Sequence, residues 1–480
     1  MSDELCFTPA TELAAMVRDR RVSARELLEA HLDRIERVNP VVNAIVTLDA
    51  EDARRRAAAA DEVTARGGTT GPLHGLPVAH KDTHLTGGMR TTFGSPLRAD
   101  FVPDDDELVV ERVRLAGGVR VGKTNTPEWA AGSHTFNPVF GATRNPYATD
   151  RSAGGSSGGS AAALAAGLVP LADGSDMGGS LRNPAAFCNV VGLRPSPGRV
   201  PSAPQLMAWA DLSVQGPMGR TVSDVALALA AMAGPSRRSP ISLEEPGASF
   251  APPLEAPTRG LRVAFAPDLG GRVPLDRAVR DVLTGQAAVL EELGAEVTED
   301  CLDLDGADEV FATLRAWQFV TTYGDLVREH PDQVKPAVRW NVERGRELTA
   351  EDVGRAHVLR TRLYQRVLDF FDRYDVLVAA TTQVVPFPVE QEYPTEIDGQ
   401  VQEDYLQWMR SCTLVSATTL PALSVPAGFT PDGLPVGLQV VGPPRGDRRV
   451  LEVGYAYEQA TGHGRRRPSL SSSRPGETAE

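Results

Sequence analysis

The sequence predicts an α/β protein: a single large domain with a mixed, twisted β-sheet core covered by helices on both faces. Short apolar strands alternate with amphipathic helices along most of the chain, a pattern typical of such sheets. The 480 residues suffice to bury a large core without disulfides or metals. The same strand–helix units continue on both sides of a proline-rich stretch, residues 235–260. We therefore interpret that stretch as a surface excursion of one domain over residues 1–465, with a boundary between two domains as the alternative.

The first elements are predicted to be helices. Ser23 and Glu26 form a capping box, and apolar residues follow with helical spacing up to Pro40. A segment rich in alanine and arginine, residues 50–66, predicts a second helix that ends at two glycines. Strands and helices then alternate: strand 76–80, helix 107–116 and strand 119–122.

The later elements are predicted from the same two spacings of apolar residues, that of a helix and that of a strand. They are a small-residue helix ending near residue 167, strand 168–172, helix 221–234, strand 261–266, helix 276–293, strand 295–299, helix 351–373 and strands 375–380, 422–427 and 437–441. The last segment, residues 466–480, is rich in serine, arginine and proline, and we expect it to be a disordered tail.

Composition excludes several classes. The formal net charge of −14 argues against a nucleic-acid partner, which requires a basic face. The four cysteines, Cys6, Cys188, Cys301 and Cys412, are far apart, so neither a zinc site nor a disulfide framework is indicated. The first residues lack an apolar core segment, and the longest small-apolar stretch is too short to span a bilayer. We expect a cytoplasmic protein with no metal, no cofactor and no membrane contact.

One motif resembles a phosphate-binding loop. Residues 117–124 match the spacing G-x-x-x-x-G-K-[ST], which works when a strand precedes the first glycine and a helix begins at the lysine. Here a predicted helix comes before the motif, and residues 119–121 have the character of a strand. We therefore interpret the segment as a helix end followed by a strand.

A second motif resembles a nucleophile elbow. Residues 155–159 match G-x-S-x-G with Ser157 at the centre, which keeps a Ser-His-Asp hydrolase of the α/β class as an alternative. Such an elbow follows a strand and needs a later histidine. Residues 148–155 do not have a strand pattern, and the later histidines are His330, His357 and His463.

A third pattern joins three segments, 75–82, 154–160 and 173–184, that are rich in glycine and serine and include one lysine. Ser180 follows Met-Gly-Gly where a strand ends, and Pro184 marks the first turn of a helix. Consecutive amides at such a turn form an anion-binding nest, and the helix N-terminus favours negative charge there. A serine beside a nest supplies the nucleophile and the oxyanion hole that acyl transfer requires.

In these segments the sequence resembles the amidase-signature family of serine hydrolases. The resemblance covers nearly the whole chain, and its core is residues 75–200. It implies a triad in which Ser180 is the nucleophile, Ser156 the bridging serine after a cis peptide at Gly155, and Lys81 the terminal base. It also implies an oxyanion hole formed by the amides of Met177, Gly178, Gly179 and Ser180.

Other residues are assigned supporting roles. Ser157, Asp176 and Arg182 are expected to brace the loop around the nucleophile rather than react. His80 stands where the family commonly has an apolar residue; on a strand it points away from the face of Lys81, so we expect it to pack. Lys81 acts as a base only when neutral, so we expect burial to lower its pKa.

The resemblance implies an amidohydrolase that cleaves the C–N bond of a small linear amide, other than a peptide bond, with carbamate (urethane) or ester cleavage by the same attack. The alternative within the family is the glutaminase component of a transfer-RNA amidotransferase. We expect a small-molecule amide or carbamate as the only partner, and a monomer or homodimer. Aromatic and apolar residues suggest an apolar pocket; the candidates are Trp129, Met207, Trp209, Trp317 and Phe319.

Overall fold

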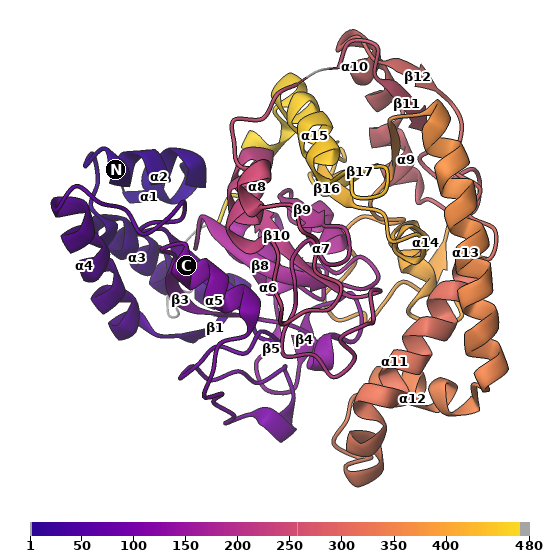
Figure 1. Cartoon of the computed structure of the whole chain (residues 1–480), viewed down its shortest axis with the longest axis horizontal. Coiled ribbons are helices and arrows are strands. Elements are labelled where there is room, and N and C mark those ends of the chain that lie inside the picture. Colours follow the sequence, from indigo (N-terminus) through magenta and orange to yellow (C-terminus); the bar gives the residue numbers. More distant parts are fainter. Residues whose placement is uncertain (1, 257, 471–480) are drawn as a thin grey trace, which may run out of the picture.

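A computed structural model describes residues 2–256 and 258–470. Its centre is an eleven-stranded sheet in the order β1-β3-β2-β8-β10-β9-β16-β17-β13-β11-β12 (Figure 1). The strands are β1 (Ile45–Leu48), β2 (Pro77–Lys81), β3 (Val119–Thr124), β8 (Leu171–Asp176), β9 (Val191–Arg194), β10 (Val214–Gly219), β11 (Arg262–Phe265), β12 (Glu296–Thr298), β13 (Val376–Ala380), β16 (Ala422–Phe429) and β17 (Pro435–Val441). Parallel and antiparallel pairs both occur, so the predicted mixed sheet is confirmed. Strands from both sides of the proline-rich stretch belong to this sheet.

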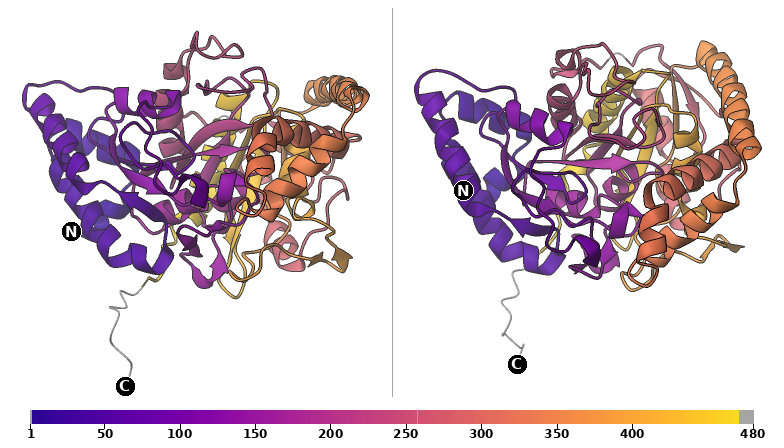
Figure 2. Two further views of the ribbon diagram at one scale, coloured as in Figure 1. Left: turned by 90° about the horizontal axis from the view of Figure 1, so that it is seen from below. Right: turned by 60° about the horizontal axis from the view of Figure 1, so that its bottom comes forward.

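Helices flank the sheet along its length. Figure 2 shows the N-terminal helices at one end of the molecule and α11 to α13 at the other. The helices are α1 (Ser2–Phe7), α2 (Ala10–Arg18), α3 (Ala24–Val42), α4 (Ala50–Ala65), α5 (Leu108–Leu115), α6 (Gly158–Ala165), α7 (Arg182–Phe187), α8 (Val222–Met232), α9 (Arg277–Leu283), α10 (Gln286–Glu292), α11 (Ala307–Glu329), α12 (Pro336–Glu347), α13 (Ala350–Arg373), α14 (Arg410–Ala417) and α15 (Asp447–Thr461). No helix among the described residues is long and apolar enough to cross a membrane.

Two apolar cores lie on opposite faces of the sheet. On β2, Val78 belongs to a core that includes residues of α5, α8 and α15, whereas Ala79 belongs to a second core with α3, α4 and α6. Leu171 and Ala172 on β8 divide in the same way. Because successive strand residues face opposite sides, helices cover both faces, as the sequence predicts.

Several predicted boundaries differ from the structure. The strand expected at 168–172 begins at Leu171 instead, because Pro170 has no N–H to donate to a ladder. The helix expected at 276–293 is divided into α9 and α10, with Gly285 at the break. Residues 148–152, expected not to be a strand, form β7, which pairs with Arg144–Asn145 outside the main sheet and so lacks a buried face.

The segment that resembles a phosphate loop has the predicted context. Helix α5 ends before Gly117, which has a φ of +92°, and β3 follows at Val119. The Lys123 side chain is buried and donates to the carbonyl of His84 and, at 2.8 Å, to Thr86. The motif is therefore a helix end and a strand, and its lysine is part of the core.

The proline-rich stretch and the C-terminal segment carry little regular structure. In the described part of 235–260 the only helical element is a 3₁₀ turn at Gly247–Phe250. Residues 466–470 run without helix or strand, and the Tyr147 hydroxyl donates to the carbonyl of Arg466 at 2.6 Å. The rest of the predicted tail, 471–480, lies outside the described residues.

Candidate active site

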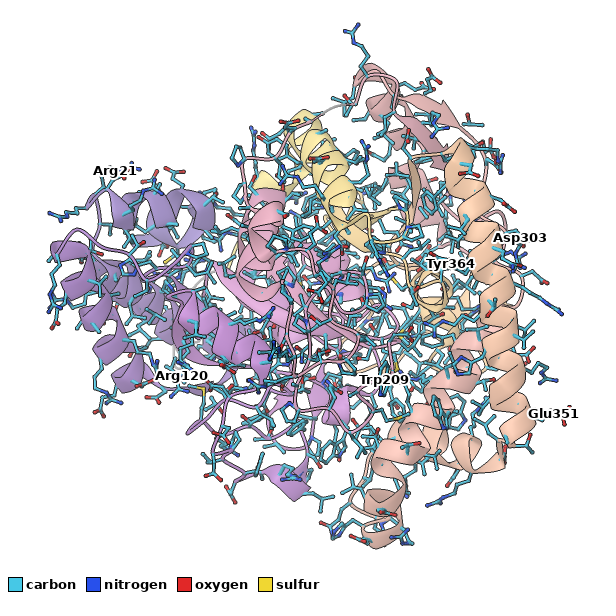
Figure 3. All side chains as sticks on the ribbon, viewed as in Figure 1. Arg21, Arg120, Trp209, Asp303, Glu351 and Tyr364 are labelled. Atoms are coloured by element: carbon cyan, nitrogen blue, oxygen red, sulfur yellow. The ribbon has the colours of Figure 1, made fainter. Side chains whose placement is uncertain are left out.

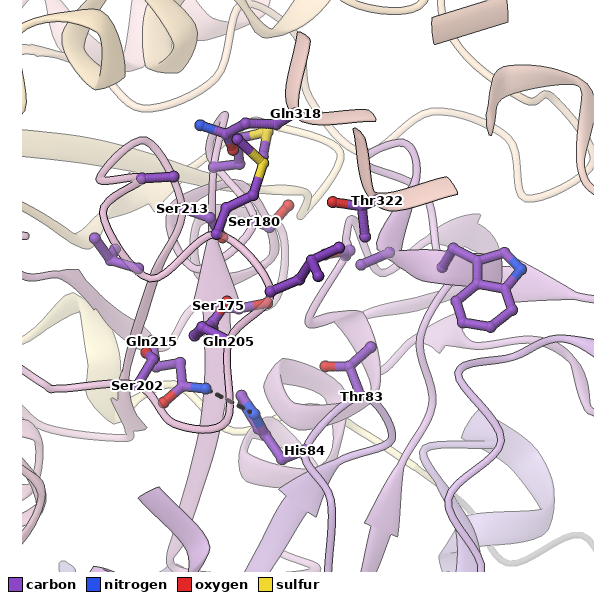
Figure 4. A pocket seen from close by; sticks show the side chains of 18 of the residues that line it. Thr83, His84, Ser175, Ser180, Ser202, Gln205, Ser213, Gln215, Gln318 and Thr322 are labelled. Atoms are coloured by element: carbon purple, nitrogen blue, oxygen red, sulfur yellow. Dashed lines mark hydrogen bonds between the residues drawn. The ribbon is translucent and has the colours of Figure 1, made fainter. Parts of the chain in front are cut away.

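The candidate catalytic residues meet at one edge of the sheet. Strands β2 and β8 are parallel neighbours, so their carboxyl ends, at Lys81 and Asp176, lie at the same edge. Ser156 precedes α6, and Ser180 precedes α7. The two serines also line one cleft of about 360 Å³ (Figure 4). Segments that are separate in the sequence therefore deliver Lys81, Ser156 and Ser180 to one place.

Lys81 lies at the buried end of this cluster. Its side chain is fully buried, and its Nζ donates to Ser156 Oγ at 2.6 Å and to Ser175 Oγ at 3.0 Å. Burial lowers the pKa of Lys81 to about 7, although the charges of Asp176 and Asp173 oppose the shift. A lysine with this pKa is substantially neutral near pH 7 and able to accept a proton.

Ser175 is a residue of this cluster that the sequence analysis missed. It lies on β8 two positions after Asp173, whose carboxylate accepts the backbone N–H of Lys81 at 2.8 Å. The sequence offered no separate signal for Ser175, because its approach to Lys81 depends on the pairing of β8 with β2. Lys81 therefore has two hydroxyl partners.

The bridging serine is held in a tightly packed turn. The peptide between Gly155 and Ser156 is cis, as predicted. A Cβ on Gly155 would lie 3.0 Å from the backbone nitrogen of His134 and from Thr135 Oγ1, so a side chain there would require these neighbours to move. The Ser133 hydroxyl donates to the Gly155 carbonyl at 2.5 Å. This packing fixes the position of Ser156 beside Lys81.

The loop before Ser180 offers three free amides rather than four. Gly179 has a φ of +112°, and its N–H donates to Asp176 at 2.8 Å. Its amide is therefore already used, which corrects the predicted four-amide oxyanion hole. Within residues 2–256 and 258–470, the amides of Met177, Gly178 and Ser180 have no protein acceptor, and all three residues line the cleft. These amides are the donors available to an oxyanion.

Asp176 and Arg182 hold this loop through hydrogen bonds on its buried side. Asp176 accepts hydrogen bonds from the amides of Gly179 and Leu181 and from the guanidinium of Arg182 at 3.0 Å, and Arg194 lies 3.3 Å away. All three charged side chains are fully buried. Burial raises the pKa of Asp176, but Arg182 and Arg194 outweigh it and hold the pKa well below its usual range. Asp176 therefore connects the loop before Ser180 to two buried arginines as a carboxylate.

Replacing Asp176 with alanine is expected to destabilise the protein strongly. The change would leave Arg182 and Arg194 buried without their counterion, which typically costs about 3–5 kcal/mol. Urea unfolding followed by fluorescence measures the loss. Asp150→Ala, at a site with 79% side-chain exposure, is the matched control and should change the free energy of unfolding by less than about 0.5 kcal/mol. Equal values for both variants would contradict the bracing role.

A second group of buried polar side chains lies next to Lys81. The sequence analysis considered His80 but did not predict its contacts with the others. Asp173 contacts His80 at 2.5 Å, and His84 lies 3.7 Å away on its other side. Burial raises the pKa of Asp173, but the two histidines outweigh it and lower the pKa to about 2. His80 is buried away from the cleft, as expected, although its main partner is a carboxylate. His84 contacts Glu107 at 3.3 Å and lines the cleft (Figure 4).

The cleft contains some of the predicted pocket residues. Trp129, Met207 and Phe319 line it, whereas Trp209 and Trp317 do not. Trp209 (labelled in Figure 3) is 78% exposed to solvent, although its neighbours Ala208 and Ala210 line the cleft. Trp317 packs against His357 of α13, because residues 315, 318, 319 and 322 occupy the face of α11 toward the cleft. Aromatic type alone did not show which residues face the substrate.

The histidine-dependent alternative lacks its partner. The hydroxyl of Ser157 donates to the carbonyl of Ser175 at 3.5 Å. In the described part of the chain, no histidine side chain hydrogen-bonds to Ser157, including His330, His357 and His463. The Ser157 amide instead donates to the Ser180 carbonyl at 3.2 Å, which fits a supporting role.

Ser156, Ser180 and the buried Lys81 thus lie together with the amides of the loop before Ser180 at one edge of a large mixed sheet. The family model described as Amidase matches residues 26–451, and the chain belongs to this amidase-signature family. An acylamidase from Rhodococcus erythropolis is 39% identical over 462 residues, covering 95% of each chain. A glutamyl-tRNA(Gln) amidotransferase subunit of Moorella thermoacetica is 37% identical, covering 97% of this chain and 99% of its own. The structure of a bacterial aryl acylamidase superimposes with a TM-score of 0.87 at 30% identity, covering 95% of this chain and 96% of that one.

Proposed function

We propose that this protein hydrolyses the C–N bond of small linear amides through an acyl-enzyme on Ser180. The observation that carries the proposal is the hydrogen bond of 2.6 Å between Lys81 and Ser156, made by a buried lysine with a pKa of about 7. Three amides without a protein acceptor lie in the described loop that leads to the nucleophile. A base, a relay hydroxyl and an oxyanion hole are the parts that acyl transfer needs.

The proton moves along the two serines. Neutral Lys81 accepts the proton of Ser156 while Ser156 accepts that of Ser180, and Ser180 Oγ bonds to the substrate carbonyl carbon. The amides of Met177, Gly178 and Ser180 hold the oxyanion. The C–N bond then breaks as the proton returns through Ser156 to the leaving nitrogen. Water repeats the attack and releases the acid, so the enzyme recovers its starting protonation state.

The apolar walls of the cleft favour acyl or aryl groups of moderate size. Trp129, Phe319 and Tyr323 line it together, and the relatives include an acylamidase and an aryl acylamidase. Carbamates and esters present the same carbonyl to Ser180, so slower side activity on them is part of the proposal. We propose that the chain acts alone, as a monomer or homodimer.

Glutaminase activity within an amidotransferase is the second candidate. It is favoured by the relative from Moorella thermoacetica, which is 37% identical over almost the full length of both chains. In that case the chain would release ammonia from glutamine and depend on partner proteins for high activity. Activity of the purified chain alone separates the two candidates.

The test is a hydrolysis screen of the purified chain on aliphatic amides, anilides, carbamates, esters and glutamine. Ser180→Ala protein serves as the background control. We expect rapid hydrolysis of amides or anilides without any partner. Activity restricted to glutamine would favour the second candidate, and activity that persists in the Ser180→Ala protein would overturn the mechanism.

A further inference from the structure

Arg315 is a buried cation of the cleft for which the described residues provide no counterion. Arg315 of α11 lines the cleft, and only 5% of its surface is exposed. Among the residues that the structure describes, no carboxylate lies within 4.0 Å of its guanidinium. The buried Arg182, Arg194 and Arg199 each pair with an aspartate. A buried arginine without such a partner is costly, so its position requires an explanation.

The neighbours of Arg315 are neutral and fix its orientation. Its Nε donates to Asn341 at 3.1 Å, its Nη2 to the Tyr405 hydroxyl at 2.7 Å, and its Nη1 to the sulfur of Met177 at 3.0 Å. The ring of Phe319 lies under it, 4.4 Å from the guanidinium carbon. A guanidinium has five N–H donors, so two remain after these contacts. Met177 belongs to the oxyanion loop, so the charge lies beside the reaction centre.

Helix α11 adds two more polar groups to the same wall. Gln318 and Thr322 follow Arg315 by about one and two turns, and both line the cleft. Their side chains make no hydrogen bond to any described residue. Figure 4 shows Gln318 and Thr322 around the part of the cleft that contains Ser180. Arg315, Gln318 and Thr322 therefore form a polar stripe with unused donors on the wall of the cleft that also contains Ser180.

We propose that Arg315 and Gln318 form a subsite for a carboxylate carried by the amide substrate. The guanidinium would supply the charge and its unused N–H groups, and the Gln318 amide a further donor. A bound carboxylate would provide the counterion that the described part of the protein lacks. The inference rests on the proposed amidase function and narrows its substrates to amides with a carboxylate near the scissile bond.

The test compares matched pairs of substrates. Glutaramate against hexanamide places the carboxylate on the acyl side, and N-acetyl-4-aminobenzoate against acetanilide places it on the amine side. We expect kcat/KM to favour the charged member of at least one pair by about 10- to 100-fold. Arg315→Met should remove that preference mainly by raising KM for the charged substrate, and Arg315→Lys should restore part of it.

Two controls keep the result interpretable. Arg328→Met, on the same helix with 63% side-chain exposure, should leave the preference unchanged. Binding of glutarate to Ser180→Ala protein, measured by calorimetry, should weaken at least tenfold when Arg315→Met is added. Hydrolysis of neutral amides with no charge preference would overturn the subsite but not the amidase function. Failure to hydrolyse any amide would overturn the function, and glutarate binding would then decide on the subsite alone.

Discussion

Ser180→Ala is expected to abolish turnover of every amide substrate, with a loss of about 10⁴-fold or more in kcat. The reason is that Ser180 belongs to the loop with the free amides and lines the same cleft as Ser156, which hydrogen-bonds to Lys81. Labelling with a fluorophosphonate, followed by mass spectrometry of the digested protein, measures the same property independently. The wild-type protein should carry the label on Ser180, and the variant should carry none.

The controls for this prediction come from the histidine alternative. His330→Ala, His357→Ala and His463→Ala should each retain hydrolysis within a few-fold of wild type, because none of these side chains hydrogen-bonds to a serine in the described residues. A label found on Ser157, or an inactive folded histidine variant, would restore the Ser-His-Asp interpretation. An unfolded Ser180→Ala protein is detected by circular dichroism before kinetics are compared.

Local patterns predicted the elements well and their partners poorly. The capping box at Ser23 is present in the structure, and the alternation of strands and helices correctly predicted a mixed sheet. The order of the strands was not predictable, because β2 pairs with β8 across more than ninety positions of the chain. Such pairings depend on packing among all the elements rather than on any one segment. Helix α12 was missed, although Pro336 at its first position and the helical spacing of Ala337, Val338 and Val342 were local signals.

The candidate catalytic residues could be named from short motifs, whereas the direction in which a single amide or side chain points could not be predicted. The amide of Gly179 points toward Asp176 because Gly179 has a positive φ. No residue pattern predicted this orientation. Arg315 comes from a helix distant in the sequence, and one arginine among apolar neighbours is ordinary for a helix. The proposed carboxylate subsite therefore lies in a part of the site that only the structure shows.

Lys81→Met is expected to lower kcat/KM by about 10²- to 10⁴-fold, the usual contribution of a positioned base. In the wild type, the pH dependence should follow the titration of this group. Because burial lowers its pKa to about 7, kcat/KM should rise with pH below 7 and level off above it. The residual activity of the variant should lack this rise. A wild-type profile without an inflection between about pH 6 and 8 would contradict a lysine base with this pKa.

The same substitution should not weaken the fold, which separates a chemical loss from a structural one. Above about pH 7 the native protein holds Lys81 neutral, whereas the unfolded chain keeps it charged up to its ordinary pKa of 10.5. The unfolded state therefore binds more protons in this window, so this group lowers the free energy of unfolding most at pH 7 and below, and progressively less as the pH rises toward 10.5. Methionine removes the cost of burying an amine, so urea unfolding at pH 7 should show Lys81→Met to be at least as stable as wild type. A markedly less stable variant would instead mean that the hydrogen bonds of Lys81 to Ser156 and Ser175 outweigh the cost of its burial.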